Sequence, residues 1–232
     1  MKAWIKKTII NLLEVHTEER KLLEFISSLQ LSMDQKLLDI GCGYGRKLKL
    51  ISALGINSVG VEVNPTLVQK CQEAGLNCLT VDEFNKTGEL YDVLLMSHII
   101  EHFLPDQLLE FMDSYLDRLK PGGHLIIATP LGTPYFYDDF DHIKPYNPAG
   151  ISMVFGGNES QVQYYARNQI HLEDIWFRRE PFKLTYFAGL YVKKHLRFPI
   201  LANLLLALLF RFSFGVIGQT NGWIGIYRKM TA

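Results

Sequence analysis

The sequence is poor in three features that would narrow its class: cysteine, net charge and long apolar runs. Its three cysteines, Cys42, Cys71 and Cys78, lack C-x-x-C spacing, so neither a disulfide framework nor a zinc site is expected. The expected location of the protein is a reducing cytoplasm. The 24 Lys and Arg balance 24 Asp and Glu, which gives no overall attraction to nucleic acid. The apolar run 198–210 is shorter than the roughly 20 residues that span a bilayer.

The most informative stretch is residues 37–47, which read LLDIGCGYGRK. An apolar run typical of a buried parallel strand contains Asp39, and glycines follow at positions 41, 43 and 45. Glycine permits positive φ and close approach to a ligand, and a helix opening after the loop would offer free N–H groups. The spacing differs from the dinucleotide motif G-x-G-x-x-G, and no Gly-Lys-Ser/Thr of a P-loop is present.

Further strand ends carry polar residues. Residues 58–63 predict a second strand ending in Glu62, whose carboxylate could accept both ribose hydroxyl hydrogens; a solvated strand-end acid is the alternative. Residues 77–81 predict a third strand, followed by Asp82, Glu83 and Phe84, where an aromatic ring could pack on an adenine. Residues 91–96 predict a fourth strand that runs into SHIIEH.

These segments together resemble class I S-adenosylmethionine-dependent methyltransferases. The resemblance rests on DIGCGYG at 39–45, YDVLLMSHIIEH at 91–102 and LKPGGHLII at 119–127, and it is dense over residues 36–130. It implies an α/β fold: a doubly wound, Rossmann-like sheet of seven mostly parallel strands, with an antiparallel last strand inserted between the fifth and sixth. It also implies S-adenosylmethionine as cofactor, bound by Asp39, Gly41, Cys42, Gly43, Gly45, Glu62, Val63, Asp82, Glu83, Phe84 and Ser97.

The segment His98-x-x-Glu101-His102 also matches the H-x-x-E-H pattern of certain zinc proteases. That chemistry needs both histidines on one helical face and a third ligand, whereas this segment starts at a strand end. No metal is therefore expected. His98 is interpreted as bordering the substrate pocket, with Glu101 and His102 capping or orienting the next turn.

Residues 131–180 form the predicted lid and substrate segment, because proline and aromatic residues interrupt the regular pattern there. Within it, DHIKPY at 141–146 resembles a segment of one branch of the family, and His142 is the first candidate for a catalytic base. A histidine tied into loop hydrogen bonds is the alternative. His98 is the second catalytic candidate, and Tyr135, Tyr137 and Tyr146 are the predicted substrate-binding residues.

The ends of the chain complete a single predicted domain, 1–232. Residues 1–31 predict two helices broken near 16–17, and residues 182–187 and 222–228 predict the last two strands. Between these strands lies an apolar segment with basic flanks, at 193–217. Helices that are apolar on all faces are usually buried, so this one is expected to pack on the enzyme; peripheral membrane contact is the alternative.

The predicted function is methyl transfer from S-adenosylmethionine to a small-molecule or lipid-linked acceptor, at oxygen. Two other classes stay open: a cofactor-binding protein without methyl transfer, and a peripheral membrane-binding module. The sequence predicts no nucleic-acid partner and leaves the oligomeric state open.

Overall fold

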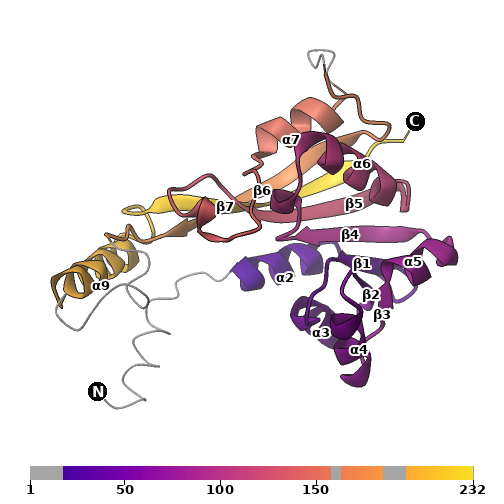
Figure 1. Cartoon of the computed structure of the whole chain (residues 1–232), viewed down its shortest axis with the longest axis horizontal. Helices are drawn as coiled ribbons and strands as arrows, with labels where there is room; N and C mark the ends of the chain where they lie inside the picture. Colours follow the sequence, from indigo (N-terminus) through magenta and orange to yellow (C-terminus); the bar gives the residue numbers. More distant parts are fainter. Residues whose placement is uncertain (1–17, 158–162, 185–196, 232) are drawn as a thin grey trace.

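The computed structural model describes residues 18–157, 163–184 and 197–231. Their strands form one seven-stranded sheet (Figure 1). The strand order is β3-β2-β1-β4-β5-β7-β6, with parallel pairing from β3 to β5 and β7 antiparallel to both of its neighbours. The predicted fold, including the inserted last strand, is confirmed. The strands are β1 (Lys36–Ile40), β2 (Asn57–Glu62), β3 (Cys78–Thr80), β4 (Tyr91–Ser97), β5 (Leu119–Pro130), β6 (Ile170–Glu180) and β7 (Gln219–Lys229).

Side chains that alternate along the strands pack into two separate hydrophobic cores. Leu38, Leu94 and Ile127 belong to the core beneath α5, α6 and α7, whereas Leu37 and Leu95 belong to the core beneath α2 and α3. Helices therefore cover both faces of the sheet, as a parallel sheet requires (Figure 1). The helices are α2 (Glu18–Ser28), α3 (Arg46–Ala53), α4 (Pro65–Glu73), α5 (Val81–Thr87), η1 (Ile100–His102), α6 (Pro105–Leu116), η2 (Phe136–Asp138), α7 (Pro148–Phe155) and α9 (Arg197–Phe212).

The first predicted N-terminal helix lies outside the described residues, and the second corresponds to α2. The third strand is shorter than predicted because α5 begins at Val81 with a capping box. The Thr80 hydroxyl accepts from the Glu83 N–H at 3.2 Å, and the Glu83 carboxylate accepts from the Thr80 N–H at 2.8 Å. The Glu83 carboxylate is thus used to start a helix.

The predicted position of the sixth strand is wrong. β6 occupies Ile170–Glu180, and residues 182–184 lie beyond its end. The sequence of β6 is too polar to resemble a buried strand. This is because β6 lies at an edge of the sheet, where few side chains need to be buried. Pairs such as Trp176 with Ile224 of β7 hold it in register.

Helix α9 contradicts the expectation of burial. Only Ala207 and Phe210 are buried among its described side chains, while Leu201 and Leu205 are 56% and 54% exposed. The helix lies near the ends of β6 and β7, away from the helices that cover the sheet (Figure 1). Within the described ranges no helix is both long and apolar enough to cross a membrane.

A buried carboxylate on α6 holds the start of β6 and gives a stability prediction. Asp113 is 2% exposed and accepts from the backbone N–H groups of Arg167 and Asn168, at 2.9 and 3.0 Å. We expect Asp113→Ala to lower the free energy of unfolding by roughly 2–4 kcal/mol, since each orphaned buried donor costs about 1–3 kcal/mol. Urea denaturation measures this loss. Glu110→Ala, an exposed change on the same helix, is the control and should leave stability unchanged.

Candidate functional site

The glycine loop joins the end of β1 to α3 and lies against β2. The Gly41 and Cys42 N–H groups donate to the Val61 carbonyl at 2.8 and 3.1 Å. Gly41 has φ +69°, and a Cβ there would lie 2.5 Å from Ile99 Cδ1. Gly45 has the same φ and caps α3. The loop geometry therefore requires glycine at these two positions.

A cavity of about 770 Å³ opens at the carboxyl ends of β1 and β2 and extends between α5 and α6. Gly41, Glu62, Val63, Phe84 and His98 line it. This is the edge of the sheet at which open α/β folds bind ligands. The structure thus brings five of the predicted site residues into one cavity.

Glu62 is the central polar group of this first cavity. It is 8% exposed, and its two carboxylate oxygens accept from the Gly43 and Asn64 N–H groups at 2.9 and 3.0 Å. A carboxylate offers about four acceptor positions, so these bonds orient Glu62 and still leave capacity for ligand hydroxyls. The same bonds tie the glycine loop to β2.

Five predicted cofactor residues in or next to the loop do not line the cavity: Asp39, Cys42, Gly43, Gly45 and Ser97. Asp39 is 2% exposed, and its burial raises its pKa to about 7. The Cys42 thiol lies 3.4 Å from the Cys78 sulfur. Ser97 is buried at the end of β4. Their placement favours support of the loop over contact with a ligand.

Two further predicted cofactor residues, Asp82 and Glu83, are exposed on the first turn of α5 and lie outside the cavity lining. In their place the cavity takes Asn85 from the same helix and Tyr115 from α6. We expected Asp82 and Glu83 to follow the end of a strand and reach the site. A capping box instead starts helix α5 at Val81, which turns both side chains toward solvent.

A second cavity, of about 560 Å³, adjoins the first and shares His98 and His102 with it. Tyr135 and His142 line it together with Arg178 and Glu180 of β6. Sequence reasoning missed the β6 residues because their strand had been placed further along the chain. No local motif marks them.

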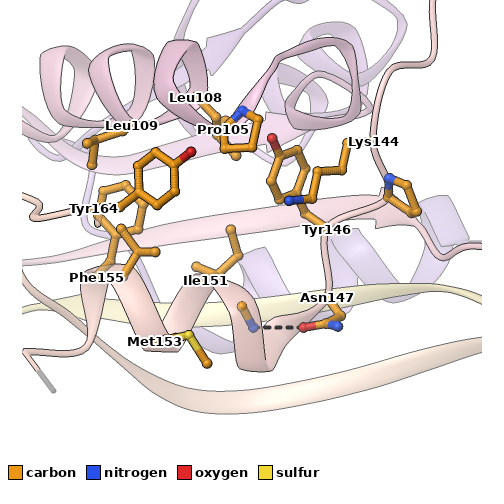
Figure 2. A pocket seen from close by; sticks show the side chains of 13 residues that line it. Pro105, Leu108, Leu109, Lys144, Tyr146, Asn147, Ile151, Met153, Phe155 and Tyr164 are labelled. Carbon is orange, nitrogen blue, oxygen red and sulfur yellow. Dashed lines mark hydrogen bonds between the residues drawn. The ribbon is translucent and has the colours of Figure 1, made fainter. Parts of the chain in front are cut away.

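Tyr137 and Tyr146 do not line the second cavity. Tyr137 is 68% exposed, and the Tyr146 hydroxyl donates to the Phe103 carbonyl at 2.9 Å. Tyr146 instead lines a separate cavity of about 260 Å³ between α6 and α7, opposite Tyr164 (Figure 2). Of the three tyrosines predicted to bind substrate, the structure places only Tyr135 beside His142.

His98 stands where the two cavities meet, held between two carboxylates. Its Nε2 lies 2.6 Å from Glu18 of α2 and its Nδ1 lies 3.3 Å from Glu101, while Glu18 also pairs with Arg178. Burial disfavours the charged imidazole, but the contacts with Glu101 and Glu18 prevail and raise the pKa of His98 to about 9. His98 is therefore cationic at neutral pH, which makes it a poor general base.

His142 lies on the loop after η2, and its Nδ1 contacts the Phe136 carbonyl at 2.8 Å. A carbonyl only accepts, so Nδ1 carries a proton, and in the neutral ring the lone pair lies on Nε2. The ring packs against Phe136 and lies 5.1 Å from the His102 ring, centroid to centroid. The other nitrogen, Nε2, lies 3.7 Å from the Asp139 carboxylate of the same loop. The hydrogen bond to Phe136 agrees with a histidine held by the loop, and the role of His142 as a base stays a prediction.

A protein-family model described as a methyltransferase domain matches residues 14–186 of the sequence. This chain belongs to the methyltransferase domain family. Membership implies S-adenosylmethionine as the methyl donor, and the glycine loop with Glu62 fits that group, because backbone N–H groups and a strand-end carboxylate suit an adenosyl ribose.

Individual similarities agree with this family. A structure of a SAM-dependent methyltransferase from Archaeoglobus fulgidus superimposes with a TM-score of 0.62, over 91% of this chain and 92% of that one, at 23% identity. A ubiquinone biosynthesis O-methyltransferase of Brucella anthropi is 30% identical over 102 residues, 40% of each chain. A phosphoethanolamine N-methyltransferase of Zea mays is 28% identical over 120 residues, 48% of this chain and 24% of that one. The matched part thus spans well under half of these two relatives.

The position of Glu62 predicts its effect on cofactor affinity. We expect Glu62→Ala to weaken S-adenosylhomocysteine binding by roughly 1–3 kcal/mol, because the ribose hydroxyls lose their acceptor and the loop loses an anchor. Titration calorimetry should record this as about a 5- to 150-fold higher Kd. Glu73→Ala, on the exposed face of α4, should bind like the native protein. An unchanged Kd for folded Glu62→Ala would remove Glu62 from the cofactor site.

Proposed function

We propose that this methyltransferase transfers a methyl group to a hydroxyl oxygen of a small acceptor bound in the second cavity. The observation that carries the proposal is the shared wall: His98 and His102 line both cavities, so ligands in the two spaces would meet there. Holding two reactants in contact is the main requirement of a displacement reaction.

The first cavity takes the cofactor in this proposal. Gly41 and Glu62 bind its adenosyl part, Phe84 borders it, and S-adenosylmethionine supplies a methyl group activated by positive sulfur. The cationic His98 contributes position rather than proton removal, because Glu18 and Glu101 hold its ring from both sides. Glu18 also places α2 against this wall.

Oxygen is favoured as the accepting atom because an alcohol or phenol must lose a proton, and the second cavity has a group suited to promote that loss. The hydrogen bond to Phe136 leaves Nε2 of the neutral His142 ring as the proton acceptor, and Arg178 and Glu180 could orient polar groups of the acceptor. The Brucella relative is named for an O-methyltransferase reaction and the maize relative for an N-methyltransferase reaction, so amines belong in the screen as well.

We assign His142 to activation of the acceptor hydroxyl and expect His142→Ala to lower turnover by about 10²–10⁴-fold. Cofactor affinity should be unchanged, because His142 does not line the first cavity. The assay follows S-adenosylhomocysteine formation with hydroxylated lipids, quinols, nucleotide-sugars and amines. His171→Ala, an exposed histidine on β6, is the matched control. Native protein that binds S-adenosylhomocysteine but methylates no acceptor would support the alternative of a binding protein.

We further propose that the acceptor is lipid-linked and that α9 rests on an anionic membrane surface. The support is the exposed leucine face of α9 and the charge of the C-terminal part of the chain. Residues 181–232 contain seven Lys and Arg and no Asp or Glu, which complements anionic headgroups. A helix of 16 residues with an apolar face suits the interface plane.

Co-sedimentation with vesicles tests this contact. Native protein should pellet with phosphatidylserine-containing vesicles at low salt, and less at high salt because ions screen the attraction. The double variant Leu201→Ser/Leu205→Ser should bind about tenfold more weakly, since it removes part of the apolar area that would be buried. Leu54→Ser, an exposed leucine after α3, is the control. Native protein that stays in the supernatant at low salt excludes the membrane contact.

A further inference from the structure

Two histidines that line the second cavity form a cluster of metal-ligating side chains with the buried Glu101. We propose that Glu101, His102 and His142 form a binding site for one divalent metal ion. Each of the three offers a ligand atom within 4.8 Å of those of the other two. This reverses the expectation drawn from the sequence that the chain holds no metal. The H-x-x-E-H pattern supplies two of the ligands, and the loop after η2 supplies the third.

Both histidines are held in the tautomer that a metal site needs. His102 Nδ1 lies 3.0 Å from the Asp141 carbonyl, as His142 Nδ1 lies near the Phe136 carbonyl. Each carbonyl requires a proton on Nδ1, so the lone pair is left on Nε2. Metal-binding histidines almost always donate their second ring nitrogen to a carbonyl or carboxylate in this way.

Glu101 supplies a buried carboxylate with unused capacity. It is fully buried, and its Oε2 accepts from the Thr129 hydroxyl at 2.9 Å. Its Oε1 has no hydrogen-bond partner among the described residues, although the His98 ring lies nearby. The His98 cation already offsets part of the charge on Oε1, and the oxygen keeps acceptor capacity that a bound cation could use. Oε1 is therefore the oxygen that we assign to the ion.

The backbone joins the two halves of the site. The Ile143 and Lys144 N–H groups donate to the Glu101 carbonyl at 2.9 and 3.2 Å. These bonds attach the loop that carries His142 directly to the residue that carries the carboxylate. Ligands bonded at about 2.1 Å to one ion lie roughly 3–4 Å apart. The ligand atoms lie within 4.8 Å of one another, so closing each pair by at most about 1–2 Å completes the site.

The ligand set indicates the kind of ion. Two imidazoles and one carboxylate suit divalent transition metals such as Mn²⁺, Fe²⁺ and Zn²⁺, and three protein ligands leave coordination positions open. The second cavity lies beside these ligands, so an acceptor oxygen could take an open position. The carboxylate of Asp139, 3.7 Å from His142 Nε2, adds negative charge close by.

The second candidate cluster, Cys42, Cys71 and Cys78, is equally tight but is unsuited to a metal. Thiolates are the ligand form of cysteine, and burial raises the pKa of Cys78 to about 11 and also raises that of Cys42. The cluster packs beneath the glycine loop, where a Cβ on Gly60 would lie 2.7 Å from Cys42 Sγ. These thiols act as core side chains.

The role of the ion rests on the proposed function. A hydroxyl bound to a divalent ion has a lowered pKa and releases its proton to water near neutral pH. The oxygen lone pair then forms the bond to the methyl carbon as the carbon–sulfur bond breaks, and that electron pair stays on sulfur. No electrons are gained or lost overall. With the ion bound, His142 acts as its ligand and the proton goes to water; without the ion, the same ring nitrogen is the base of the proposed function.

The test measures ion binding directly on the full-length protein after treatment with EDTA. Mn²⁺ and Zn²⁺ are titrated separately by calorimetry, and free Mn²⁺ is counted by electron paramagnetic resonance. We expect one ion per chain and a higher thermal midpoint at saturation. His102→Gln and His142→Ala should each weaken binding at least tenfold and lose the thermal shift, while His171→Ala should match the native protein. Circular dichroism verifies that each variant is folded.

Two results would overturn the metal site: no binding to native protein at up to about 1 mM ion, or unchanged binding in the folded double variant His102→Gln/His142→Ala. Turnover separates this failure from failure of the proposed function. Hydroxyl methylation that persists in EDTA, without ion binding, removes the metal site and keeps the methyltransferase assignment. Ion binding that follows the ligand variants, without methylation of any hydroxylated acceptor, keeps the site and removes the acceptor assignment.

Discussion

The burial of the Glu101 side chain is the constraint on which the functional region depends. A carboxylate that is fully removed from water needs hydrogen-bond or charged partners, and those of Glu101 come from separate parts of the chain. The Thr129 hydroxyl at the end of β5, the His98 ring after β4 and the loop around Ile143 all converge on Glu101. The wall between the two cavities is the result.

This wall also explains why α2 matters to the site. Glu18 reaches from the first turn of α2 to His98 and Arg178, so three distant segments share one network of charges. Each member balances another: two carboxylates face an imidazolium and a guanidinium. Such a network stays ordered only when all members are present, because a lone buried charge is expensive. The second cavity is therefore built by tertiary contacts rather than by one motif.

Apolar side chains are buried in the sheet but largely exposed on α9. In the sheet, alternate side chains enter one core or the other and leave little apolar surface exposed. On α9, leucines such as Leu201 and Leu205 face solvent although the helix is rich in apolar residues. Hydrophobicity alone did not distinguish these cases, because burial depends on what the fold places opposite a face. For α9, little in the described structure covers it.

The antiparallel last strand was expected only from the resemblance to class I methyltransferases. What the sequence determined by itself was a glycine loop after a buried strand, with Glu62 at the next strand end. Local patterns sufficed there, because strand periodicity and glycine geometry act over a few residues. Tertiary structure alone decided that β6 is a polar edge strand and that Glu101 and His102 lie beside His142, about 40 residues further along the chain. Such pairings depend on how the loop folds back onto η1, and no sequence spacing records that path.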